Sequence, residues 1–482
     1  MRSSPGAERR GRSEAAMADT RSPGKPGPRA VLPCGQVGAR MRPNSPPEYE
    51  SLRPASADGD LALTGGIKYH HSMKIWLKLF IGAVLGIVLG YLLPEANGTV
   101  LRVLGWLEGM AIRIGRYALV PVLFFSLVIA IYELRQDKRF WGHIFRTLLF
   151  VLGTTAFLIA LGIIVTQIFT PGRIRIPREE QTEVAALEIS RNFQELFPSN
   201  MFNALAGDGE YLFPFFIFAF FLGLGLSYDR NYSRPVISLI DSLSRIFYHV
   251  SAFFSEILSP VLIVLAAYWA VRFRETLKSG VFMELILLLG IFSAALAFVV
   301  FPLLLYFIKP KINPWAILYG SLGPALAAFF SGDINFSLPV LMQHAKENLG
   351  IRRRSNTITL SLYSVFGRAG SAAVAASAFI VVINSYSSLG VTTADLLSIG
   401  LKALAISFLL VRRPGDGAYA ALAVLCMSYG RGYEAGYLIL KPLAFYLIAV
   451  GTFLDVMLSC FSSFVLARFA GFQEDRTLRH YI

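Results

Sequence analysis

The feature that most limits the fold of this chain is a series of long apolar runs, separated by short charged or proline-containing segments. A helix of about 20 residues crosses the hydrocarbon core of a bilayer, and several runs reach this length. Hydrophobic residues make up 55% of the chain and charged residues 16%, proportions that are unusual for a soluble globular protein. The sequence therefore predicts an all-α polytopic membrane protein.

Six apolar runs in the first two thirds of the chain predict six membrane-spanning helices. They cover residues 73–93, 112–134, 145–169, 211–226, 246–271 and 282–308. Basic residues concentrate in loops that would all lie on one side, at 135–139, 230–234, 309–311 and 346–354. Because positively charged loops stay in the cytoplasm, we expect a plasma (inner) membrane protein with a cytoplasmic N-terminus. The basic segment 272–278 falls on the other side, against this trend.

Residues 1–72 have a different composition, rich in Arg, Pro, Ser and Gly and without hydrophobic periodicity. We expect this segment to be disordered. Met73 opens an apolar run and resembles a natural start of translation. The segment is therefore either an addition to the native protein or a basic cytoplasmic tail.

Charge and motif content exclude several classes of function. The net charge of +14 lies largely in the N-terminal tail and the short loops, which favours a role in topology and not in nucleic-acid binding. The three cysteines and six histidines have no metal-ligand spacing, so we expect no metal site. No phosphate-cradling loop is present, which argues against ATP-driven pumping.

A pattern repeats in the last third of the chain. Two apolar arms flank a polar tip at 331–339, and a long helix with one central charge, Arg368, follows. Two more arms flank a second tip at 412–417, and a second long helix with one central charge, Asp455, follows. This order predicts an inverted repeat of two opposed re-entrant hairpins, with a binding site at mid-membrane. Two ordinary helical pairs remain an alternative, because residues 394–411 are long enough to span a bilayer alone.

Arg368 is the most costly residue of this pattern. It lies near the middle of the apolar run 357–383, where an arginine costs about 2.5 kcal/mol or more. Gly367 and Gly370 beside it would let the helix loosen, which is tolerated only where backbone lines a cavity. Arg368 either snorkels or pairs with a neighbouring acid, or it belongs to a substrate or ion site.

Two further segments carry a resemblance to a known family. Residues 117–128, Tyr-Ala-Leu-Val-Pro-Val-Leu-Phe-Phe-Ser-Leu-Val, and residues 197–206, Phe-Pro-Ser-Asn-Met-Phe-Asn-Ala-Leu-Ala, resemble segments of the dicarboxylate/amino acid:cation symporters. The resemblance to these glutamate-transporter homologues covers about residues 73–470. It implies eight transmembrane helices with two opposed re-entrant hairpins, and a homotrimer. It also implies a scaffold within 73–311, an elevator-like transport domain at 312–470 and a cytoplasmic tail at 471–482.

At the sites of the family the sequence diverges. The sodium-ligating Asn-Met-Asp-Gly-Thr of typical members is replaced by residues 367–371, Gly-Arg-Ala-Gly-Ser, and the arginine that grips the substrate by Leu458. The resemblance implies two sets of site residues. The substrate-binding candidates are Ser337, Arg368, Arg413, Gly415, Asp455 and Ser459. The ion-coupling candidates are Asp333, Thr154, Thr155 and Ser371.

These substitutions suggest how the site differs. We hypothesise that Arg368 takes the electrostatic place of a coupling cation, so that sodium coupling is weaker, altered or replaced by proton coupling. Arg412 or Arg413 either restores the lost guanidinium or faces water and lipid headgroups. In the family the acid at Asp455 pairs with the substrate's amino group, which favours an amino acid; here it could instead pair with Arg368 or Arg413. Asp333 is expected to be a partner of these arginines before a proton carrier.

The expected function is secondary active symport of a small carboxylate-bearing solute, an acidic or neutral amino acid or a dicarboxylate. The driving force would be a sodium or proton gradient, with no cofactor besides the coupling ion. The expected partners are the solute, the lipid bilayer and further copies of the chain. The alternative is a transporter-derived sensor or an anion-conducting protein. An enzyme is not expected, because no nucleophile–base pair or metal motif lies at membrane depth.

Overall fold

The computed structural model describes residues 74–93, 98–174, 200–205, 210–308, 313–386, 391–412, 414–430 and 432–474. By its contacts the chain divides into Met1–His70 and His71–Ile482, and only the second unit contains described residues. The predicted disordered tail at 1–72 therefore lies outside the described residues. Of the predicted C-terminal tail, only residues 471–474 are described.

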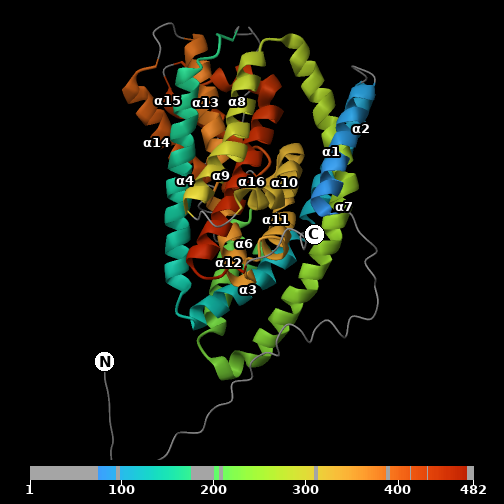
Figure 1. The fold of residues 1–482 in the computed structure, drawn as a ribbon, viewed down its shortest axis with the longest axis vertical. Coiled ribbons are helices and arrows are strands. Elements are labelled where there is room, and N and C mark those ends of the chain that lie inside the picture. The colour runs from blue at the N-terminus through green and yellow to red at the C-terminus, as the bar shows by residue number, and fades with distance from the viewer. Residues whose placement is uncertain are drawn as a thin grey trace, which may run out of the picture. The chain divides into compact units, whose positions relative to one another are not determined.

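The described residues confirm the predicted all-α fold, and they form no strand beyond one isolated bridge between Ile351 and Gln473 (Figure 1). The N-terminal helices are α1 (Ile75–Leu92), α2 (Gly98–Arg116), α3 (Leu119–Gln136), α4 (Phe140–Ile168), α6 (Phe213–Leu226), α7 (Arg230–Ser279), α8 (Met283–Ala295) and α9 (Phe301–Ile308). The C-terminal helices are α10 (Pro314–Ser331), α11 (Ile334–Glu347), α12 (Arg353–Phe366), α13 (Ala369–Tyr386), α14 (Thr393–Leu409), α15 (Gly417–Tyr429) and α16 (Ala444–Phe469). Short 3-10 or π turns, η1 (Met201–Ala204), η2 (Leu296–Val300), η3 (Leu410–Arg412) and η4 (Gly436–Leu443), complete the described elements.

Eight helical segments of the described chain are long and apolar enough to cross a membrane, but they are not the eight expected from the sequence. The predicted fourth span, 211–226, is the 14-residue helix α6, which is short for a bilayer. The predicted hairpin arm 394–411 lies in the 20-residue apolar segment Thr393–Arg412, which is long enough to cross a membrane, as the sequence already indicated. Hydropathy alone does not fix where a helix begins and ends, so the length of α6 could not be read from the sequence.

The apolar run around Arg368 is two helices and not one. Helix α12 ends at Phe366 and α13 begins at Ala369, so Gly367 and Arg368 lie in a break between them. The loosening expected at the flanking glycines is therefore present. Gly367 still donates its N–H to the carbonyl of Tyr363, and beyond it the chain leaves helical geometry.

The junction between α10 and α11 is equally tight. Gly332 ends α10 in the left-handed conformation, with φ of 64°, which costs a glycine little. Asp333 then caps α11 by accepting a hydrogen bond from the N–H of Asn335 at 2.9 Å. Both α10 and α11 pack against α16, which lies in the middle of the helices in Figure 1.

Helix α1 packs along α7 through small residues spaced four apart, Gly82, Gly86 and Gly90. A Cβ atom at any of the three would lie 2.6 Å or closer to a backbone carbonyl oxygen of α7. Glycine is therefore required for this close approach, which is the usual way for membrane helices to gain packing. Figure 1 shows the two helices side by side.

Candidate functional site

The centre of the candidate site is the break between α12 and α13. There the carboxylate of Asp455 in α16 accepts hydrogen bonds from the first residues of α13. One Asp455 oxygen accepts the backbone N–H groups of Gly370 at 2.7 Å and Ser371 at 3.2 Å. The other accepts the Ser371 hydroxyl at 2.6 Å. A carboxylate at a helix N-terminus satisfies N–H groups that have no partner within the helix and complements the helix dipole. Asp455 thus caps the N-terminus of α13 although it lies 84 residues beyond Ser371 in the sequence.

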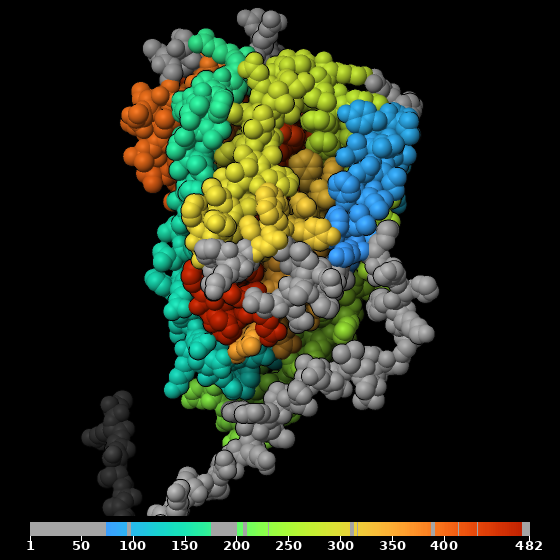
Figure 2. Space-filling view, in the orientation of Figure 1, coloured from blue at the N-terminus to red at the C-terminus, as the bar shows by residue number. Residues whose placement is uncertain are grey.

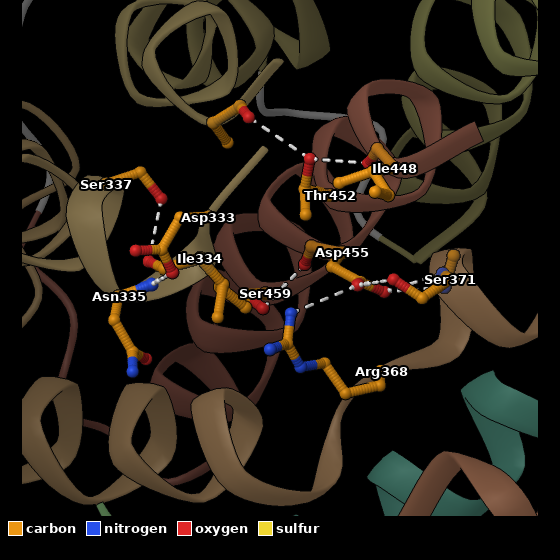
Figure 3. A network of polar contacts seen from close by, with 12 residues as sticks. Asp333, Ile334, Asn335, Ser337, Arg368, Ser371, Ile448, Thr452, Asp455 and Ser459 are labelled. Atoms are coloured by element: carbon orange, nitrogen blue, oxygen red, sulfur yellow. Dashed lines mark hydrogen bonds and ion pairs between the residues drawn. The ribbon is translucent and has the colours of Figure 1, made fainter. Parts of the chain in front are cut away.

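Arg368 is fully buried beside Asp455, yet its side chain makes no hydrogen bond with the described residues. Its Nη1 atom lies 3.7 Å from Asp455 Oδ2, an ion-pair distance that is too long for a hydrogen bond. None of its three side-chain nitrogen atoms has a hydrogen-bond partner within the part of the chain that the structure describes. Figure 3 shows the guanidinium pointing toward Asp455 and Ser459. Buried polar groups are nearly always paired, so a buried guanidinium whose five N–H donors have no acceptor among the described residues is an exception.

Two of the candidate serines are buried near this network and make only local hydrogen bonds. The hydroxyl of Ser459 donates to the backbone carbonyl of Asp455 at 2.6 Å, and that of Ser337 donates to the carbonyl of Ile334 at 2.9 Å. Each hydroxyl therefore uses its proton within its own helix and keeps oxygen lone pairs free. Thr452 connects α16 to α10 by donating to the carbonyl of Ala328 at 3.1 Å (Figure 3).

Asp333 has a different partner from the one expected. Its Oδ2 atom accepts a hydrogen bond from Nε of Arg116, at the end of α2, at 2.6 Å. Arg116 also bonds the exposed carboxylate of Glu210 at 2.9 Å. Asp333 thus pairs with Arg116, and within the described residues it has no ion pair with Arg368; the expected pair with Arg413 lies outside them. A fully buried carboxylate needs such a partner, because its desolvation is otherwise uncompensated.

Arg116 is the residue that the sequence analysis missed. A signal was available, because Arg113 and Arg116 both lie inside the predicted span 112–134. An arginine inside an apolar span normally faces protein or a watery cavity. Arg116 is only 11% exposed, whereas Arg113 is exposed.

The threonine pair on α4 lies beside the last turn of α12. The hydroxyl of Thr154 donates to the carbonyl of Phe150 at 2.7 Å and lies 3.3 Å from the hydroxyl of Tyr363. The hydroxyl of Thr155 is buried and has no partner among the described residues. These oxygen atoms are suitable ligands for a hard cation, but the described residues contain no cluster of acidic, His or Cys side chains that could hold a metal ion.

The second tip is described only in part. Arg413 lies outside the described residues, and Arg412 is half-buried at the end of η3. Gly415 lines a cavity of about 270 Å³ together with Gly332, at the first junction. The first residue of α15, Gly417, leaves no room for a side chain: its Cβ would lie 2.9 Å from Ser371 Oγ and 3.9 Å from Arg368 Nη1. Helix α15 therefore begins directly against the Arg368 network.

The cavity is bordered by charged and aromatic side chains of α2 and α7, including Glu108, Tyr268 and Arg272. Its remaining walls are the two junctions and the start of α16. In Figure 2 the surface is hollowed between α8 and the blue helices α1 and α2, with atoms of α10 and α16 visible at the bottom. The junctions at Gly332 and Gly415 thus separate this cavity from the buried Arg368.

Comparison with known proteins identifies the family of this chain. Residues 75–469 match the sequence model of the sodium:dicarboxylate symporter family. The chain belongs to this family. The resemblance deduced from the sequence is therefore confirmed, and the chain is a multi-pass membrane protein of a transporter family and not an enzyme.

Relatives of this symporter-family member are distant. The serine/threonine transporter SstT of Enterococcus faecalis is 24% identical over 310 residues, which are 64% of this chain and 70% of the relative. SstT of Lacticaseibacillus casei is 24% identical over 345 residues, covering 69% and 73% of the two chains. The proton/sodium-glutamate symport protein of Bacillus subtilis is 24% identical over 186 residues, only 36% of this chain and 42% of that protein.

Proposed function

We propose that this chain is a secondary active symporter of a small carboxylate-bearing solute, with Arg368 as the anchor for the carboxylate. Membership of a family of cation-coupled symporters supports transport. The relatives' names, a serine/threonine transporter and a glutamate symport protein, refer to solutes that carry a carboxylate. The coupling ion is sodium or a proton.

The observation that carries the proposal is the difference in hydrogen bonding between the side chains of Arg368 and Asp455. Asp455 accepts three hydrogen bonds from the start of α13, whereas the guanidinium of Arg368 donates none to the residues that the structure describes. A guanidinium binds a carboxylate through two parallel hydrogen bonds, which gives both orientation and affinity in a dry site. Ser459 and Ser337 contribute free lone pairs nearby, and the backbone at Gly415 closes the site.

The same difference bears on the class of solute. A carboxylate has about four positions for donors, and three of those of Asp455 are used by hydrogen bonds from Gly370 and Ser371. The guanidinium of Arg368 lies 3.7 Å from Asp455 Oδ2, so a substrate ammonium group at the remaining position would be repelled by this positive charge. We therefore propose that the site prefers a carboxylate without an α-ammonium over the corresponding amino acid, against the sequence-based preference for an amino acid.

The membrane arrangement belongs to the same proposal. We propose that α10 with α11, and α14 with α15, are two re-entrant hairpins that enter from opposite sides of the membrane. The tight junction at Gly332 and Asp333 and the packing of both pairs on α16 or α13 support this arrangement. The N-terminus is cytoplasmic, the protein is a homotrimer, and residues 312–470 move as the transport domain against a scaffold within 73–311.

Arg368 also affects which ion can drive transport. Its permanent positive charge lies at the break between α12 and α13, where it makes the binding of an additional cation less favourable. We propose that it takes the place of one coupling cation, with Thr154, Thr155, Ser371 and Asp333 as the residues that respond to the remaining ion. Replacing Arg368 should therefore change the ion dependence of uptake as well as its rate.

Uptake into liposomes that contain the purified protein tests the proposal, with sodium and proton gradients imposed separately. Labelled succinate and aspartate differ only by the α-ammonium, so their comparison isolates that group. We expect gradient-driven succinate uptake that exceeds aspartate uptake, its loss in Arg368→Met, and its retention in the exposed control Arg113→Met. Faster aspartate uptake would refute the preference, and full uptake by Arg368→Met would refute the anchor. Binding without accumulation under either gradient would favour the alternative, a sensor or an anion-conducting protein.

A further inference from the structure

A second, separate pocket lies between α3, α4, α6 and α12. It has a volume of about 210 Å³, and every lining side chain except Ser361 is apolar or aromatic. Ile131 of α3, Ile144 of α4 and Ile217 of α6 form three of its walls. None of the residues proposed for the substrate or ion sites lines it, so it has no part in the function proposed above.

Three of the four helices around this pocket, α3, α4 and α12, belong to segments that are long and apolar enough to span the membrane. Trp141 lines the pocket and is nevertheless 59% exposed, so the pocket is connected to the surface of the helices. An apolar pocket open to the bilayer is filled by hydrocarbon and not by water.

Two basic side chains, Arg135 and Lys138, lie beyond one end of the pocket. Leu127, Ile131 and Arg135 follow one another at four-residue spacing on α3, so Arg135 lies on the pocket face about 6 Å beyond Ile131. Lys138 follows three residues later, in the turn before α4 begins at Phe140. Both basic residues are exposed, and in the described part of the chain neither has an ion-pair partner.

The nearest acids do not neutralise these two charges. Glu133 pairs with Arg353 at 3.2 Å, and Asp137 is bonded by Arg354. Trp141 lines the pocket from the first turn of α4, three residues after Lys138, and tryptophan is enriched at membrane interfaces. The result is an apolar pocket with an unpaired positive mouth at the end of a membrane-spanning helix.

From this charge complementarity we propose that the pocket binds an anionic phospholipid of the surrounding membrane. One acyl chain occupies the space between Ile131, Ile144 and Ile217, and the phosphate contacts Arg135 and Lys138. A juxtamembrane Lys or Arg attracts anionic lipid, and the pocket adds a place for one chain. Because the walls come from α3, α4, α6 and α12, the lipid contacts all four helices.

Native mass spectrometry of the full-length protein tests this, with phosphatidylglycerol and phosphatidylcholine of identical acyl chains. We expect the wild type to retain phosphatidylglycerol preferentially, and the preference to fall by about tenfold or more in the double variant R135Q/K138Q. The matched control R113Q, an exposed arginine of α2 without a partner among the described residues, should keep the preference.

A second variant separates the pocket from the charges. Ile144→Trp fills the pocket and leaves both basic residues in place, so it should lower retention of phosphatidylglycerol. Equal retention of the two lipids by the wild type would overturn the proposal. An unchanged preference in R135Q/K138Q would also overturn it, and this variant leaves the packing of the pocket intact.

Discussion

Replacing Asp455 should destabilise the protein far more than replacing its partner Arg368. In Asp455→Asn the guanidinium of Arg368 stays buried and charged, without its ion-pair partner and without donating a hydrogen bond to the described residues. In Arg368→Met the carboxylate of Asp455 keeps its three donors from Gly370 and Ser371, and the cost of burying the guanidinium disappears. The two halves of one ion pair thus have unequal consequences.

The magnitude follows from the distance. Two unit charges 3.7 Å apart interact by about 4 kcal/mol at an effective dielectric constant of about 20. Measured losses on removing one partner of a buried pair are about 3–5 kcal/mol, so we expect roughly 4 kcal/mol for Asp455→Asn. For Arg368→Met the lost attraction is offset by the lost desolvation cost, and we expect a change below about 2 kcal/mol.

Thermal unfolding of the purified variants, followed by tryptophan fluorescence at one fixed heating rate, checks the order. A fixed rate is needed because unfolding of such proteins is often irreversible. The double variant R368M/D455N should unfold close to R368M, since the unpaired charge is gone, so the two effects are not additive. An Arg368→Met variant as unstable as Asp455→Asn, or a double variant with the summed loss, would refute the reasoning.

The remaining predictions concern packing and the second ion pair, and the same unfolding measurement checks both. Gly86→Ala places a Cβ against the backbone of α7 and should destabilise by about 1–3 kcal/mol, whereas Gly153→Ala, which meets nothing within 4 Å, should cause no loss; equal effects would show that the α1–α7 approach is not tight. Asp333→Asn should cost about 3 kcal/mol, because Arg116 loses its buried partner, while Glu210→Gln, at an exposed carboxylate, should change stability by less than about 1 kcal/mol. A larger effect from Glu210 would mean that the exposed pair is the important one.

Much of the architecture was predictable because a membrane restricts the choices. In hydrocarbon every backbone polar group must be bonded internally, so long apolar runs can only be helices. The break at Gly367 and Arg368 was predictable for a related reason, since a charge at that depth needs protein around it and glycines relax the backbone. The resemblance at residues 117–128 and 197–206 was enough for the family, which the match over 75–469 confirms.

The lengths of individual helices were less predictable. Residues 211–226 are as apolar as any span, yet α6 begins at Phe213 and ends at Leu226, which is too few residues. Hydropathy averages over a window and does not register where the chain turns. The segment Thr393–Arg412 has the length of a span, as the sequence already indicated for residues 394–411, so length by itself does not distinguish a span from a hairpin arm.

The sequence by itself determined that this chain is an all-helical membrane protein and that Arg368 and Asp455 lie at membrane depth. Only the tertiary structure decided which groups these charges meet. Asp333 forms an ion pair with Arg116, which lies 217 residues earlier in the sequence. Asp455 accepts hydrogen bonds from the start of α13, and the donors of Arg368 have no acceptor among the described residues. Hydrophobicity is a property of a segment and can be summed along the chain. The pairing of buried charges depends on distances of a few ångströms between distant segments, and these exist only in the folded protein.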